Sequence, residues 1–164
     1  MKTLLILRHA KSSWKEARLT DHDRPLNKRG HRDAPKMGRL LRDKELVPQL
    51  IISSTAKRTR KTVKLVSKAC GYKGERLFRE ELYAAEPEAY IEALKELDDK
   101  YQRVMVVGHN PGLEELLERL TAEEHTLPTA ALAEVSLPIQ TWRELDDSIK
   151  GELIKLWVPR QLSA

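Results

Sequence analysis

Five short apolar runs along the chain predict the strands of a β-sheet. The runs at 3–7, 50–53 and 104–107 lack polar alternation, which is typical of strands that are covered on both faces. The runs at 132–137 and 152–158 show mixed alternation, which suits strands nearer a sheet edge. We expect these last two strands to run antiparallel to the rest.

The stretch 55–70 has the periodicity of an amphipathic helix. Its apolar residues recur on one side, where Cys70 fits as a small buried core residue. Ser54 or Thr55 can cap its start, and Gly71 follows its end. The opposite side carries a lysine stripe formed by Lys57, Lys61, Lys64 and Lys68. We interpret this stripe as a solvated helix face, with a patch that binds a phosphate backbone as the alternative.

Three further helices are indicated between the apolar runs. The stretches 86–99 and 111–120 are amphipathic, and Pro87 suits the first turn of the former. Residues 27–45 also show helical spacing, although Pro35 must kink this helix or mark a later start. Strands that alternate with helices in this order predict an α/β fold, a three-layer α/β/α sandwich with a mostly parallel central sheet.

Length and composition favour one compact domain over residues 1–164. The chain has 40% hydrophobic residues, enough for a sizeable core. Its first apolar run is too short for a signal-peptide core or a membrane span, so we expect a cytoplasmic protein without membrane contact. A single cysteine cannot form an internal disulfide, which agrees with a reducing compartment.

The charge balance favours anionic partners without identifying them. The net charge is +5, and 34% of the residues are charged. The aromatic residues are scattered and form no stacking platform, which weakens the case for nucleic acid. A nucleic-acid or phosphoprotein binding module that uses the lysine stripe remains the alternative outside the enzymes.

Arginine and histidine recur where the predicted parallel strands end. The first strand leads into Arg8 and His9, the second leads to Arg58, and the third leads into His109. Loops at the carboxyl ends of parallel strands converge on one crevice. We therefore expect these four side chains to meet.

Such a cluster fits phosphoryl transfer. Arginine donors match phosphoryl oxygens, and a neutral imidazole can attack phosphorus and carry the group as a phosphohistidine. A second, protonated histidine can donate to the oxygens in the transition state. Two-metal phosphatases place carboxylates beside their histidines, so arginines at these strand ends argue against a metal.

The remaining polar candidates have weaker settings. Ser12 either caps a loop or contacts phosphate through its hydroxyl or backbone N–H. His22, His31 and His125 follow no predicted strand, so we interpret them as surface or capping residues.

Four short motifs resemble those of a known family. LRHAKSSW at 7–14, RPLNKRG at 24–30, SSTAKRTRKT at 53–62 and VGHNPG at 107–112 follow one another in this order. Together they resemble the signatures of the histidine phosphatase superfamily, which is phosphoglycerate mutase-like, and most of all its short bacterial phosphohistidine phosphatase branch. The resemblance covers most of the chain and implies an enzyme that needs no cofactor.

The resemblance also implies roles for the clustered residues. His9 matches the nucleophile that becomes phosphorylated, and Arg8, Arg58 and His109 match the groups that hold the phosphoryl oxygens. Ala10 stands where many relatives have glycine, so a positive φ at this position would strain the loop.

The proton donor is less defined. The resemblance places it in REELYAAEPE at 79–88, where Glu81 is the best match and Glu80 and Glu86 are rivals. A protonated imidazole leaves more readily than an alkoxide, so an ill-defined acid favours a phosphohistidine substrate. The chain has little beyond the core elements, which suits a phosphorylated protein but also small phosphoesters. A small-molecule phosphomonoesterase or mutase-like enzyme is therefore the alternative.

Overall fold

A mixed sheet forms the centre of the molecule in the computed structural model, which describes residues 1–162. Its six strands lie in the order β3-β2-β4-β1-β5-β6. The strands are β1 (Lys2–Arg8), β2 (Leu50–Ser54), β3 (Glu75–Arg79), β4 (Arg103–Gly108), β5 (Leu132–Leu137) and β6 (Glu152–Trp157). The first four are mutually parallel, β5 is antiparallel to β1, and β6 is antiparallel to β5 at the sheet edge. The mostly parallel sheet is confirmed. The prediction that the last two strands both run antiparallel to the rest holds for β5 and is wrong for β6, because two successive antiparallel pairings give β6 the direction of β1.

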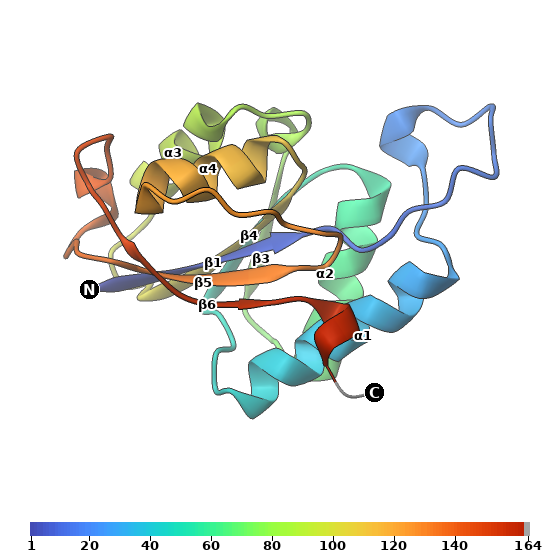
Figure 1. The fold of residues 1–164 in the computed structure, drawn as a ribbon, viewed down its shortest axis with the longest axis horizontal. Coiled ribbons are helices and arrows are strands. Elements are labelled where there is room, and N and C mark those ends of the chain that lie inside the picture. The colour runs from blue at the N-terminus through green and yellow to red at the C-terminus, as the bar shows by residue number, and fades with distance from the viewer. Residues whose placement is uncertain (163–164) are drawn as a thin grey trace.

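Helices cover both faces of this sheet. They are α1 (Lys28–Asp43), α2 (Lys57–Cys70), α3 (Pro87–Lys95) and α4 (Gly112–Thr121). Figure 1 shows α3 and α4 on one face and α1 and α2 on the other. The three-layer sandwich is therefore confirmed. Of the helices in residues 1–162, none combines the length and apolar character needed to cross a bilayer.

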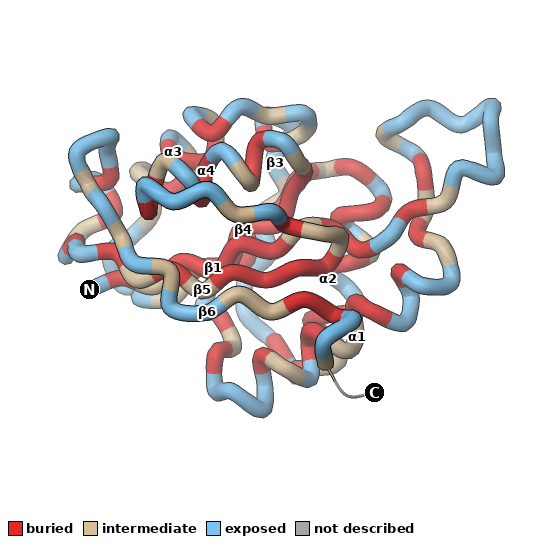
Figure 2. Tube along the Cα trace, viewed as in Figure 1, coloured by how far each residue is buried: buried red, intermediate tan, exposed pale blue. Residues whose placement is uncertain are grey.

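The central strands are buried on both faces, which explains their uninterrupted apolar runs. Leu4 and Ile6 of β1 face the core beneath α3 and α4, whereas Leu5 and Leu7 face the core beneath α1 and α2. Figure 2 shows β1 and β4 as mostly buried; only Thr3, Arg8 and Arg103 in these strands are half-buried. Successive side chains point to opposite faces of a strand, so a strand with two covered faces has no polar positions to alternate.

The helix that carries the lysine stripe starts later than predicted. α2 begins at Lys57, and its N-cap residue, Ala56, offers no side-chain cap, so the prediction that Ser54 or Thr55 caps it is wrong. Gly71 ends the helix in the left-handed conformation with φ 71°, as its position predicted.

The other helix boundaries shift by a few residues. α1 continues through Pro35, and the Asn27 side chain caps it by accepting from Gly30 N at 2.9 Å. Pro87 occupies the first turn of α3 as predicted, but this helix ends at Lys95.

The edge strand β3 has no counterpart among the five apolar runs. Its sequence, ERLFR, is charged at three of five positions, and only Leu77 and Phe78 are apolar. Edge strands tolerate such composition because one side and one edge meet solvent. The apolar pattern alone therefore could not reveal it.

The contact between α1 and α2 depends on Gly38. A Cβ added at Gly38 would lie 2.5 Å from the Val66 carbonyl oxygen. We predict that Gly38→Val lowers the free energy of unfolding by about 2–3 kcal/mol, because the two helices must separate. Urea denaturation measures this change. The exposed neighbour Arg39 provides the control, and Arg39→Ala should change the free energy by less than about 0.5 kcal/mol; equal effects would contradict the close packing.

Candidate active site

Strand register brings the two histidines together. Arg8 at the end of β1 lies opposite Gly108 at the end of β4, so the residues that follow, His9 and His109, leave the sheet side by side. Their ring centroids are 5.2 Å apart. The end of β2, on the other side of β4, brings Ser54 to the same place. The His109 ring nitrogen Nε2 lies 2.8 Å from the Ser54 hydroxyl oxygen.

Hydrogen bonding fixes the tautomer of His9. Its Nδ1 lies 2.7 Å from the Ala10 carbonyl oxygen, which can only accept. Nδ1 therefore carries the proton, and Nε2 keeps a free lone pair. Burial, above all other influences, lowers the pKa of His9 to about 3. The ring is thus a neutral base with its nucleophilic nitrogen unprotonated at physiological pH.

The loop after β1 accommodates alanine without strain. Ala10 does not adopt a positive φ, so the departure from glycine has no backbone cost. Its N–H donates to the Thr62 hydroxyl oxygen at 3.0 Å, and that hydroxyl donates to the Arg58 carbonyl at 2.7 Å. The loop that carries His9 is therefore tied directly to α2.

Ser54 orients the His109 ring. The Ser54 oxygen accepts the Ala56 N–H at 3.2 Å, which directs its own hydrogen toward Nε2 of His109. We assign the His109 proton to Nδ1, which is buried and has no partner within residues 1–162. Burial, followed by the Arg58 charge, lowers the pKa of His109 to about 4. Burial thus favours the neutral form of His109, whereas the sequence suggested a protonated ring.

Two guanidinium groups flank the imidazoles. Arg8 donates from Nη1 to the Leu127 carbonyl at 3.0 Å, and its buried Nε has no partner in the described chain. Arg58 is buried and donates two hydrogen bonds to Asp21. Its Nη1 donates to the Asp21 backbone carbonyl at 2.7 Å, and its Nη2 donates to the Asp21 carboxylate at 3.1 Å. The structure therefore brings together all four residues singled out at the strand ends.

Asp21 completes the site, and nothing in the sequence pointed to it. Its carboxylate accepts from Arg24, Arg58 and the Tyr83 hydroxyl. The Tyr83 hydroxyl first, and then the two arginines, hold the pKa of Asp21 well below its usual range. Asp21 thus remains an anion that orients Arg58 and Tyr83.

Tyr83 links the site to His22. The Tyr83 ring lies edge-on to His109, with centroids 5.6 Å apart, and edge-on to His22 at 4.9 Å. His22 is half-buried, and its Nε2 lies 2.9 Å from the Thr55 hydroxyl oxygen. With 39% of its side chain exposed, His22 is a surface residue as predicted, and its ring also contacts Tyr83. The 3-10 turn Asp21–Asp23 folds it against the pocket wall.

Ser12 lies beside the pocket within a side-chain network. It is buried, and its hydroxyl accepts from Arg24 Nη2. Arg24 also donates to Asp21, and its guanidinium stacks on the Trp14 ring at 3.2 Å. The Ser12 oxygen is thus already engaged with protein.

The candidate acids lie apart from one another. Glu81 lines a hollow between β3 and α3 together with Leu77. Glu86 lines a different hollow together with His109. Within residues 1–162, neither these two nor Glu80 forms a hydrogen bond or ion pair with either site histidine. Of these carboxylates, Glu86 rather than Glu81 thus shares a hollow with His109.

Carboxylates and histidines do not gather as a metal site. Over residues 1–162, no group of three or more His, Cys, Asp or Glu side chains is arranged to hold a metal ion. A reaction without metal or cofactor remains a prediction from the arginines.

The buried neutral imidazoles predict an acid-shifted titration. By NMR, the His9 and His109 rings should titrate with midpoints of about 3 and about 4, below the ordinary 6.5. From pH 6.5 down to these values, the unfolded chain binds the protons and the folded chain does not. The free energy of unfolding should therefore fall by up to about 1.4 kcal/mol per pH unit for each ring.

Two further measurements test whether burial of these two rings causes the lowered pKa values. The double variant His9→Asn/His109→Asn should lose this part of the pH dependence. Saturating inorganic phosphate should raise both midpoints, because an anion favours imidazolium. A midpoint above 6 for either ring without phosphate would contradict the burial argument.

Comparison with known proteins agrees with this geometry. The family described as the histidine phosphatase superfamily (branch 1) matches residues 4–85. An uncharacterized chloroplastic protein of Arabidopsis thaliana is 36% identical over 152 residues, which cover 87% of this chain and 70% of that protein.

Solved structures share nearly the whole fold. One is described as a candidate phosphohistidine phosphatase, SixA, from Agrobacterium tumefaciens, with a TM-score of 0.83 and 30% identity over 96% of this chain and 98% of that one. A second, with the same description, from Nakamurella multipartitia, has a TM-score of 0.85 and 26% identity, with 96% of both chains covered. The match to the family and the shared fold thus show that this chain belongs to the histidine phosphatase superfamily.

Proposed function

We propose that this protein is a phosphatase that hydrolyses phosphohistidine on a protein substrate through a covalent intermediate on His9. One observation carries the proposal. Two buried donors on the residues that neighbour His9, Nε of Arg8 and Nδ1 of His109, have no partner within residues 1–162. Buried donors are rarely left unpaired, and a phosphoryl group supplies the acceptor oxygens that satisfy them.

The first step transfers the phosphoryl group to His9. The Nε2 lone pair of His9 forms a bond to phosphorus as the bond from phosphorus to the substrate imidazole nitrogen breaks. The leaving imidazole takes a proton from solvent and departs neutral. Arg8, Arg58 and His109 stabilise the charge on the phosphoryl oxygens, and Asp21 keeps Arg58 oriented for this purpose.

The second step restores the enzyme. A water oxygen attacks phosphorus, the bond to Nε2 of His9 breaks, and the water proton passes to solvent. Inorganic phosphate leaves, and the His9 ring is again neutral with its proton on Nδ1. The Ala10 carbonyl accepts a hydrogen bond from Nδ1–H throughout, so the ring keeps one orientation in both steps.

The type of leaving group distinguishes the substrate classes. An imidazole needs little help to leave once it is protonated, whereas an alkoxide needs a placed acid. None of the three candidate carboxylates bonds to the site histidines in the described chain, which supports a substrate with a P–N bond. The likeness to proteins described as phosphohistidine phosphatases supports the same class.

Loss of the nucleophile should abolish both turnover and labelling. We predict that His9→Ala reduces hydrolysis of a phosphohistidine protein at least about 10³-fold, because no covalent intermediate forms. Rapid quench with ³²P-labelled substrate should show an acid-labile label on the wild type and none on the variant. The exposed residue Gln140, which lines none of the hollows described, supplies the control variant Gln140→Ala, which should behave as wild type. Normal labelling of His9→Ala would refute the proposal.

The carboxylates should matter only for phosphate monoesters. We predict that Glu80→Gln, Glu81→Gln and Glu86→Gln each change hydrolysis of the P–N bond less than about threefold. On an alkyl phosphate, Glu86→Gln should lower kcat about tenfold or more, since Glu86 is the candidate acid that lines a hollow with His109. Steady-state kinetics on both substrates decides this. A wild type that strongly prefers one sugar or nucleotide phosphate would favour the small-molecule alternative.

A further inference from the structure

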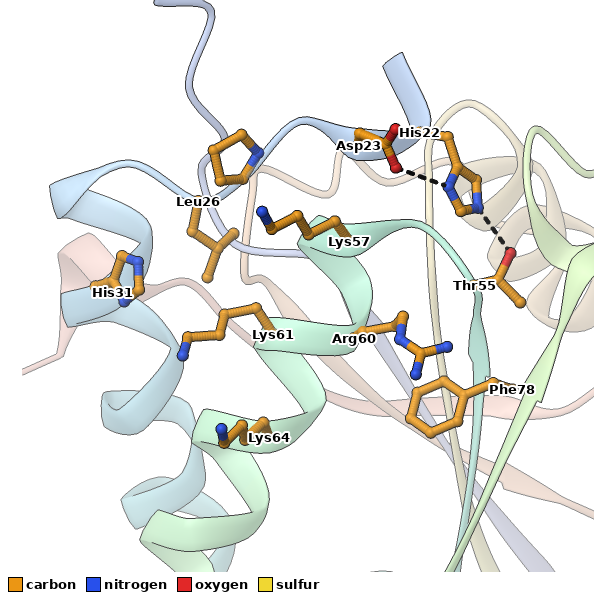
Figure 3. Close-up of a pocket in the computed structure, with 11 residues that line it drawn as sticks. His22, Asp23, Leu26, His31, Thr55, Lys57, Arg60, Lys61, Lys64 and Phe78 are labelled. Atoms are coloured by element: carbon orange, nitrogen blue, oxygen red, sulfur yellow. Dashed lines mark hydrogen bonds and ion pairs between the residues drawn. The ribbon is translucent and has the colours of Figure 1, made fainter. Parts of the chain in front are cut away.

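A basic groove runs along α2 away from the candidate active site. It consists of two hollows of about 700 and 490 Å³ that share Arg60, Lys64 and Phe78 and are therefore continuous. The first hollow also contains Lys57 and Lys61 (Figure 3). Seven cationic residues line the two hollows: Lys57, Arg60, Lys61, Lys64, Lys68, Lys73 and Arg76.

The cations of this groove have no acidic partners. None of the seven forms an ion pair in the described chain, although Arg24, Arg58 and Arg119 elsewhere each pair with a carboxylate. Asp23 is the one acidic residue among those that line the two hollows. A set of unpaired like charges disfavours itself by repulsion, and an anionic occupant removes that cost.

The groove is more than a solvated helix face, because it has a partly apolar floor. Leu26 and Pro25 come from the segment before α1, and Phe78 comes from β3. The Arg60 guanidinium lies over the Phe78 ring, 4.7 Å from its centroid. Charged rims around an apolar floor suit a polypeptide whose backbone and apolar atoms enter the groove while its carboxylates meet the lysines.

One end of the groove touches the wall of the active site. His22 and Thr55 line the groove and are joined at 2.9 Å (Figure 3). His22 packs on Tyr83, which packs on His109. A polypeptide with its phosphorylated side chain at His9 could therefore continue past His22 into the groove. The lysine stripe spans roughly 17 Å along α2, about the length of five extended residues.

We propose that this groove binds an acidic segment of the phosphorylated protein, adjacent to the phosphohistidine. The inference rests on the proposed function. It adds that the groove determines which phosphorylated proteins the enzyme selects. Carboxylates of the segment meet the lysine stripe, and the stripe guides the substrate toward the pocket. Nucleic acid fits less well, because the Phe and Tyr rings that line the groove are not free to stack on a base. Arg60 lies over Phe78, and Tyr72 is buried with Arg76 over its ring.

A matched pair of substrates tests the groove. Two phosphohistidine peptides differ only in five residues beside the histidine, which are Asp and Glu in one and Ser and Gln in the other. Wild type should show kcat/KM about tenfold or more higher for the acidic peptide, mainly through KM, with the preference shrinking as salt rises. Lys61→Glu/Lys64→Glu should remove the preference, and Lys61→Gln/Lys64→Gln should give an intermediate value.

Controls separate local charge from folding and net charge. Hydrolysis of phosphoramidate, which has no peptide, should be unchanged in both groove variants. Lys100→Glu/Lys155→Glu changes the net charge equally outside the groove and should keep the preference. The proposal is overturned if both groove variants keep the wild-type preference for the acidic peptide. It is also overturned if Lys100→Glu/Lys155→Glu loses that preference as fully as Lys61→Glu/Lys64→Glu does.

Binding distinguishes failure of the groove from failure of the proposed function. Fluorescence anisotropy with the unphosphorylated acidic and neutral peptides needs no catalysis. Tighter binding of the acidic peptide that is lost in Lys61→Glu/Lys64→Glu supports the groove, whether or not the phosphopeptides are hydrolysed. If neither phosphopeptide is hydrolysed, the proposed function has failed. Equal binding of the two peptides, or tighter binding of a single-stranded oligonucleotide of equal charge, overturns the groove proposal.

Discussion

The position of β4 between β1 and β2 is the constraint on which the site depends. Because these three strands are parallel and share one register, the residues that follow them emerge at the same level of the sheet. His9 and His109 become neighbours, and the His9 N–H donates to the Gly108 carbonyl at 3.1 Å. Ser54 arrives from the opposite side to orient His109. A shift of one residue in either pairing would turn a side chain to the other face of the sheet.

The core of the fold and the strand-end residues could be predicted because their signals are local. A strand buried on both faces must be apolar throughout, so the runs that became β1, β2 and β4 were visible. Arg8, His9 and His109 were visible because these charged or titratable side chains lie within two residues of the end of those apolar runs. Topology then brings such residues together at the carboxyl edge of the sheet.

The rest of the site depends on contacts that no local pattern encodes. Asp21 and Tyr83 are 62 positions apart, and their contact exists only because the turn after β1 folds back over the pocket. The Leu127 backbone carbonyl accepts hydrogen bonds from both Arg8 and Asn110. Every residue has a backbone carbonyl, so the amino-acid type at position 127 could not reveal this contact. β3 was missed because its charges conceal a strand that is anchored mainly by pairing with β2.

Both outer strands of the sheet carry charges where another chain could pair. β3 has charged side chains at three of its five positions, and β6 has Glu152 and Lys155. An open strand edge is a template for a further strand, and charges along it oppose the stacking of identical copies. The protein can therefore leave both sheet edges uncovered by helices without favouring self-association into extended β-structure.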